Sequence, residues 1–153
     1  MIKKTFIEQI RSRWAEGKFI CVGLDSELNK IPFHVQNRNA SIGATILDFN
    51  KSIIKETKDL VCCYKPNVAF YEEHGIEGHY ALIRTIKYIH EFVPGVPVIL
   101  DAKRGDIGNT NNCYVKAAFD SLEADAITIF PYMGREAMQP FLDRKDKGII
   151  RET

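Results

Sequence analysis

Short apolar runs alternate with amphipathic segments along almost the whole chain. Four of these runs have the length of a strand and no polar alternation, at residues 19–23, 60–64, 96–100 and 126–130. Between them, apolar residues recur every three or four positions, which is the spacing of one helix face. Strand-sized apolar runs separated by helices are typical of a parallel sheet covered by helices, so we expect the strands to be buried on both faces.

Capping residues and apolar spacing place the helices. Thr5 and Glu8 have the spacing of a capping box, and Gly17 follows the apolar repeat as a stop signal. Ser41 can cap a second helix through its hydroxyl. Apolar spacing predicts three further helices, over residues 82–93, 115–122 and 135–142.

Polar residues cluster where the predicted strands end. Asp25 follows the first strand, Lys65 follows the second, and Asp101, Lys103 and Asp106 follow the third. Neither a G-x-G-x-x-G sequence nor a Walker A loop follows the first strand, which disfavours the common nucleotide-binding α/β folds. A constellation built from the C-terminal ends of several strands is typical of a (β/α)8 barrel.

The chain offers only about half of such a barrel. We count four βα units after an N-terminal helix, and Ile149 and Ile150 look like the start of a fifth strand. A closed barrel needs roughly 200 residues or more. We therefore predict an α/β fold in which residues 1–153 form one domain, the first half of a (β/α)8 TIM barrel, interrupted at strand five.

Composition and charge narrow the class of protein. Hydrophobic residues make up 45% of the chain and charged residues 27%, with a formal net charge of +1. This balance predicts one globular domain and offers no basic surface for nucleic acid or an anionic membrane. The apolar runs are too short to span a bilayer and the N-terminus does not resemble a signal peptide, so we expect a cytoplasmic protein. The four cysteines lack zinc-ligand spacing, and no metal site is expected.

The segment from Asp101 to Thr110 contains the largest group of candidate catalytic side chains. Its carboxylates and lysine follow the spacing D-x-K-x-x-D. A lysine between two aspartates is held cationic, yet it can deliver a proton to a group bound beside it. A salt-bridged surface loop would give the same string. Asp25 and Lys65 at neighbouring strand ends favour a functional site instead.

Three motifs together resemble a known family. Val22-Gly-Leu-Asp25, Tyr64-Lys-Pro-Asn-Val-Ala-Phe-Tyr-Glu72 and Asp101-Ala-Lys-Arg-Gly-Asp-Ile-Gly-Asn-Thr110 are similar to motifs of orotidine 5′-phosphate decarboxylase. The resemblance covers residues 6–148 and is closest to the bacterial subgroup with longer chains. The third motif also occurs in related phosphosugar decarboxylases, so the three in this order carry the identification.

The resemblance implies a homodimeric TIM-barrel lyase of pyrimidine biosynthesis. It would convert orotidine 5′-monophosphate to uridine 5′-monophosphate (UMP) and carbon dioxide without a metal or an organic cofactor. The family's catalytic residues map onto Lys65, Asp101, Lys103 and Asp106. Its substrate-binding residues map onto Asp25, Lys65, Ile107 and Thr110. The resemblance further implies that Asp25 holds ribose hydroxyls, and that Asp106 and Thr110 reach the neighbouring subunit's site.

Two alternatives remain open from the sequence. One is a relative that decarboxylates a keto-sugar phosphate with magnesium. The other is an inactive half-barrel remnant that works only with a partner chain, because open sheet edges and an uncovered apolar face favour association. In the family, the loops that grip the phosphate and close over the pyrimidine belong to the second half of the barrel. We therefore expect the 153-residue chain alone to be inactive or nearly so.

Overall fold

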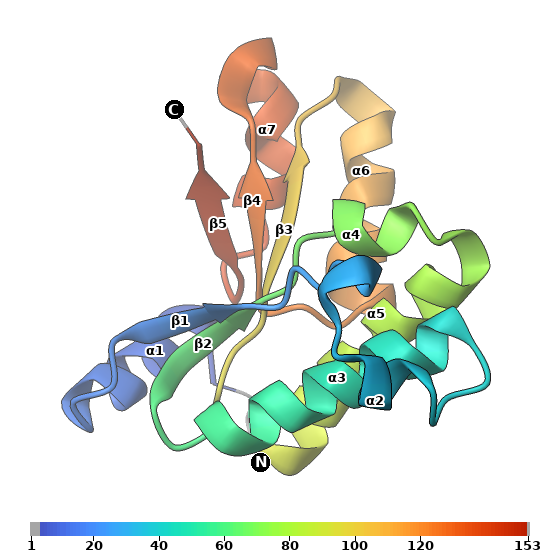
Figure 1. The fold of residues 1–153 in the computed structure, drawn as a ribbon. Coiled ribbons are helices and arrows are strands. Elements are labelled where there is room, and N and C mark those ends of the chain that lie inside the picture. Colours follow the sequence, from blue (N-terminus) through green and yellow to red (C-terminus); the bar gives the residue numbers. More distant parts are fainter. Residues whose placement is uncertain (1–3, 153) are drawn as a thin grey trace.

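Parallel strands alternate with helices along the chain (Figure 1). The structure is a computed structural model that describes residues 4–152. Its strands are β1 (Ile20–Gly23), β2 (Val61–Lys65), β3 (Ile99–Arg104), β4 (Ala126–Ile129) and β5 (Gly148–Arg151). Its longer helices are α1 (Phe6–Ala15), α3 (Ile42–Thr57), α5 (Gly75–Phe92), α6 (Gly108–Lys116) and α7 (Arg135–Leu142). Two helices of one turn, α2 (Phe33–Gln36) and α4 (Ala69–Glu72), lie in the connections.

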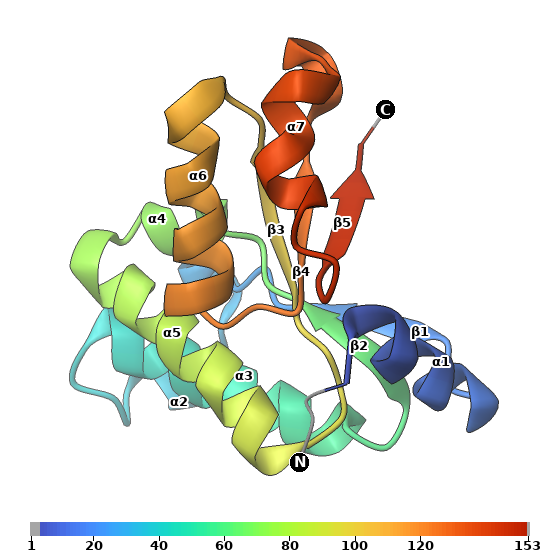
Figure 2. The same ribbon diagram turned by 180° about the vertical axis from the view of Figure 1, so that it is seen from behind.

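The strands follow one another in space in the order of the chain. β1 pairs with β2, and β3, β4 and β5 form a second group, all in parallel. Single bridges between Tyr64 and Val98 and between Asn67 and Asp101 connect the two groups. The view from behind shows α5, α6 and α7 in front of the strands (Figure 2). The predicted parallel α/β arrangement is confirmed. No helix within residues 4–152 is long and apolar enough to cross a membrane.

The predicted helix boundaries agree with the structure where a cap is visible in the sequence. The Thr5 hydroxyl accepts from the Glu8 N–H, and the Glu8 carboxylate accepts from the Thr5 N–H at 2.8 Å, which completes the capping box. Ser41 caps α3 through the Ala44 N–H. Helix α6 begins at Gly108, seven residues before the predicted start at residue 115. The polar residues of its first turns give no apolar repeat to detect.

Strand β3 begins and ends later than predicted. It covers Ile99–Arg104 rather than residues 96–100. Pro97 has no N–H to donate, and the Val98 N–H donates to the Asp125 carboxylate at 3.0 Å. The ladder with β4 therefore starts at Ile99. As a result, the acidic and basic residues predicted to follow this strand lie partly within it.

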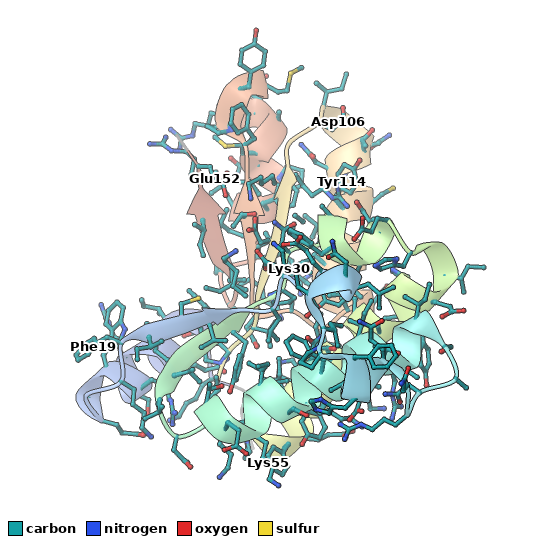
Figure 3. All side chains as sticks on the ribbon, in the orientation of Figure 1. Phe19, Lys30, Lys55, Asp106, Tyr114 and Glu152 are labelled. Atoms are coloured by element: carbon teal, nitrogen blue, oxygen red, sulfur yellow. The ribbon has the colours of Figure 1, made fainter. Side chains whose placement is uncertain are left out.

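Burial differs between the strands. β2 and β4 are buried along nearly their whole length, as predicted. The prediction is wrong for the first strand: Ile20 of β1 is 56% exposed, and Phe19, just before β1, is 68% exposed (Phe19 is labelled in Figure 3). β1 has a strand neighbour on one side only, so its apolar residues are not enclosed.

Tyr71 of α4 anchors the segment that follows β1. Its side chain is fully buried, and its hydroxyl donates to the Leu24 carbonyl at 2.9 Å while accepting from the Asn50 amide at 2.9 Å. We predict that Tyr71→Phe lowers the free energy of unfolding by about 1–3 kcal/mol, because two buried polar groups lose their partner. Urea denaturation measures this. Tyr132→Phe, at an 85% exposed tyrosine, is the control and should leave the midpoint unchanged; equal midpoints for all three proteins would refute the role of Tyr71.

Candidate active site

A buried carboxylate from β3 holds two ammonium groups. Asp101 is 5% exposed. Lys65, at the end of β2, donates to Asp101 Oδ2 at 2.6 Å. Lys103, two residues further along β3, donates to Asp101 Oδ1 at 2.5 Å. The structure thus brings together three of the residues that the sequence singled out, and it does so from two neighbouring strands.

The hydrogen bonds decide the charge state of Asp101. Burial alone would raise the pKa of this carboxyl. Hydrogen bonds from Lys103, Lys65 and Thr128 outweigh burial and hold the pKa of Asp101 below its ordinary value. Asp101 is therefore ionised throughout the neutral range, and it accepts three hydrogen bonds, two on Oδ1 and one on Oδ2.

Lys103 is cationic and partly open to solvent. Its hydrogen bond to Asp101 raises the pKa of Lys103 above its ordinary value, against a smaller opposite effect of burial, and Glu152 adds to the increase. The Lys103 ammonium lies 3.3 Å from Glu152 Oε1, and its side chain is 49% exposed. A fixed positive charge with an accessible side can stabilise negative charge that develops on a bound molecule, and it can donate a proton.

Sequence reasoning missed two residues of this cluster. Glu152 follows β5 directly (Figure 3). A charged residue near the end of a predicted strand was the signal that singled out Asp25 and Lys65. The start of a fifth strand was predicted at Ile149 and Ile150, so Glu152, two positions after this pair, could have been found. Thr128 lies in the middle of β4, is 4% exposed, and donates to Asp101 Oδ1 at 3.0 Å. Nothing in an apolar run distinguishes such a threonine from one that only packs.

Asp106 lies in the turn between β3 and α6, away from this cluster. Its N–H donates to Asn111 Oδ1 at 2.9 Å, and its carboxylate accepts from the Ile107 N–H at 2.7 Å. Within residues 4–152 it forms no ion pair with Lys103, whose acidic partners there are Asp101 and Glu152. Figure 3 shows Asp106 near the start of α6 and Glu152 at the end of β5.

The remaining predicted residues are exposed at the same ends of the strands. Asp25 follows β1, whose end stays close to β2 because the Leu24 N–H donates to the Lys65 carbonyl at 3.1 Å. Ile107 is 58% exposed, and Thr110 lies exposed in the first turn of α6. None of the three is hydrogen-bonded to the Asp101 cluster within the described residues. In the same part of the chain, no group of three His, Cys, Asp or Glu side chains could hold a metal ion.

The ionisation of Asp101 affects how the free energy of unfolding depends on pH in the acidic range. Its pKa is lower in the folded protein than the value of about 3.9 expected when unfolded. This carboxylate therefore stabilises the fold above that value, and the contribution is lost as the pH falls through the lowered folded pKa. When the pH is lowered from 6 to 3, the free energy of unfolding should decrease less in Asp101→Asn than in the wild type. Urea denaturation at each pH measures this. Equal losses in both proteins would contradict this.

Comparison with known protein families gives a match over most of the chain. The model of the family described as "Orotidine 5'-phosphate decarboxylase / HUMPS family" matches residues 18–149. An orotidine 5′-phosphate decarboxylase from Herpetosiphon aurantiacus is 53% identical over 143 residues, covering 93% of this chain and 51% of the relative. One from Flavobacterium johnsoniae is 48% identical over 132 residues, covering 86% and 47%. The chain spans about half the length of the curated relatives it matches.

Comparison with solved structures also finds orotidine 5′-phosphate decarboxylases. An OMP decarboxylase from Leishmania donovani superposes with a TM-score of 0.81 at 38% identity, over 96% of this chain and 52% of that one. An orotidine-monophosphate-decarboxylase from Toxoplasma gondii gives a TM-score of 0.86 at 40% identity, over 97% and 48%. These neighbours are TIM barrels, so the predicted fold class, the first half of such a barrel, is confirmed.

Proposed function

The chain belongs to the orotidine 5′-phosphate decarboxylase / HUMPS family, and we propose that it carries the catalytic array of an enzyme that converts orotidine 5′-monophosphate to UMP and carbon dioxide. The observation that supports this most is the meeting of Lys65, Asp101 and Lys103 at one carboxylate. The reaction belongs to the biosynthesis of pyrimidine nucleotides. The keto-sugar-phosphate alternative is not favoured, because the curated relatives at 42–53% identity bear the decarboxylase name.

The reaction needs a positive charge at one carbon atom. When the bond from C6 to the carboxylate breaks, its electron pair stays in an in-plane orbital that the pyrimidine ring cannot delocalise. A preorganised ammonium group beside C6 lowers the energy of this carbanion. In the proposal, Lys103 supplies that charge and then transfers a proton to C6, forming the C–H bond of UMP. Water returns the proton to the lysine.

Asp101 and Lys65 set the position and the electrostatic surroundings of the Lys103 ammonium group. Asp101 keeps Lys103 cationic and oriented through the bond at 2.5 Å. Its negative charge also stands where the substrate carboxylate would bind, so repulsion would be relieved as carbon dioxide leaves. Lys65 balances the second oxygen of Asp101 at 2.6 Å. Without Lys65, the buried carboxylate would face the substrate with only one cation beside it.

The other proposed roles concern substrate binding and assembly. Asp25 would bind the ribose hydroxyls from the end of β1. Ile107 would contact the substrate, and Asp106 and Thr110 would complete the site of a second copy in a homodimer. Their position supports this, because Ile107 and Thr110 are exposed, and because within residues 4–152 Asp106 forms no ion pair with the Lys103 of its own chain. We also propose a cytoplasmic location, as expected from the sequence.

We further propose that residues 1–153 correspond to the N-terminal half of one barrel domain. This is supported by the relatives, of which the chain covers about half. The phosphate-binding loop would then come from the other half. In such enzymes, binding energy from a remote phosphate orients the reacting ring and drives closure.

A chimera tests the proposed function. It joins this chain to the remaining half of the Herpetosiphon aurantiacus relative, which matches it at 53% identity. We predict that the chimera consumes orotidine 5′-monophosphate, seen as loss of its ultraviolet absorbance, with UMP as the product. Activity should persist in the presence of EDTA. A folded chimera without turnover would refute the proposed function, and activity abolished by EDTA would favour the magnesium-dependent alternative.

A further inference from the structure

Strand β3 is irregular where it carries the site. Leu100 pairs with Ile127 of β4. The next pair joins Arg104 to Ile129. Three residues of β3 therefore stand opposite a single residue of β4, which is Thr128. Such a bulge leaves backbone N–H groups without partners in the ladder, and a buried N–H without a partner is costly.

The Thr128 hydroxyl fills this bulge. Its oxygen accepts the N–H of Ala102 at 3.1 Å and the N–H of Lys103 at 3.0 Å. It donates its own hydrogen to Asp101 Oδ1 at 3.0 Å. One hydroxyl thus uses both acceptor positions and its single donor. Thr128 is buried, so water does not compete for these bonds.

Lys103 has a backbone conformation that needs such support. Its φ angle is +46°, in the left-handed region that residues with a side chain rarely adopt. A strained backbone persists only where its surroundings hold it, and here the Lys103 N–H is bound by Thr128. The same bulge carries Asp101 and Lys103 at positions from which their charged groups meet.

We propose that Thr128 is a positioning residue for the decarboxylation: it holds the Lys103 backbone and the Asp101 carboxylate in the arrangement that presents the ammonium to the substrate. Thr128 acts through these two residues and not on the substrate. The role of Thr128 in catalysis rests on the proposed function. The hydrogen-bonded arrangement of Thr128, Asp101 and Lys103 does not rest on it, because it can be tested without measuring turnover.

Titration of Lys103 in the intact chain tests the role. Lysines labelled with 13C at Cε are followed by NMR as the pH rises, and Lys103→Arg identifies the signal. In the wild type and in Thr128→Ser, which keeps the hydroxyl, Lys103 should titrate above the ordinary value of about 10.4. In Thr128→Val, which keeps the shape but loses the hydroxyl, its pKa should fall toward that value.

Thr45→Val is the matched control. Thr45 is a buried threonine of α3 whose hydroxyl donates to the Ser41 carbonyl, remote from the site. Its replacement should leave the titration of Lys103 unchanged. The proposal is overturned if Thr128→Val titrates like the wild type, or if Thr128→Ser behaves like Thr128→Val.

Amide exchange in the wild-type chain decides the question if Thr128→Val does not fold. The N–H groups of Ala102 and Lys103 should exchange at least about 100-fold more slowly than in an unfolded chain, since both are bound by a buried hydroxyl. Exchange at unfolded rates overturns the proposal. Neither experiment depends on turnover, so a chimera without decarboxylase activity would refute the proposed function and leave this result standing.

Discussion

Replacing Lys103 with alanine in the chimera should abolish decarboxylation. We expect turnover to fall on the order of 10⁴-fold or more, because one change removes both the charge that stabilises the carbanion and the proton donor. Asp101 and Glu152 would also lose their shared cation. Affinity for UMP should change by only a few-fold, since phosphate and ribose contacts lie elsewhere. Loss of substrate absorbance and calorimetric binding of UMP measure the two effects.

Lys55→Ala is the control for this experiment. Lys55 is an exposed lysine near the end of α3, far from the site (Figure 3). Its replacement should leave both turnover and UMP affinity unchanged. Turnover retained in Lys103→Ala would refute the role given to this residue. Loss of turnover together with loss of UMP binding would contradict the prediction, because it would show that Lys103 is needed to bind the nucleotide.

The second large expected effect is the loss of activity when residues 1–153 are assayed without the remaining half of the barrel. We expect residues 1–153 alone to decarboxylate orotidine 5′-monophosphate at least about 10⁵-fold more slowly than the chimera, because a substrate without its phosphate contacts is not oriented at Lys103. Assay of both proteins at equal concentration and saturating substrate measures the ratio. Robust turnover by the chain alone would contradict the proposal that the phosphate site comes from another half of the barrel.

Much of the site could be predicted because charged residues interrupt apolar runs. Lys65 and Asp101 each follow a run of strand length, and parallel strands bring their C-terminal ends together. The contact between them at 2.6 Å is the consequence. The helix caps at Thr5 and Ser41 were predictable for a similar reason, since a cap depends on residues three positions apart.

The remaining features depend on contacts between distant segments. Thr128 is 27 residues from Asp101, and in sequence it is one threonine among isoleucines. The late start of β3 depends on Asp125, which binds the Val98 N–H across the sheet. The exposure of Phe19 follows from the neighbours of β1 and not from its own pattern. Apolar periodicity carries no information about any of these.

The position of a bound nucleotide is the decisive test of the role proposed for Lys103. A crystal structure of the chimera with UMP would locate C6 of the pyrimidine relative to the three charged groups that meet at Asp101. We predict that C6 lies within about 3–3.5 Å of the Lys103 ammonium, with Lys65 and Lys103 both still bound to Asp101. A pyrimidine bound elsewhere, or a Lys103 side chain turned away from C6, would contradict it.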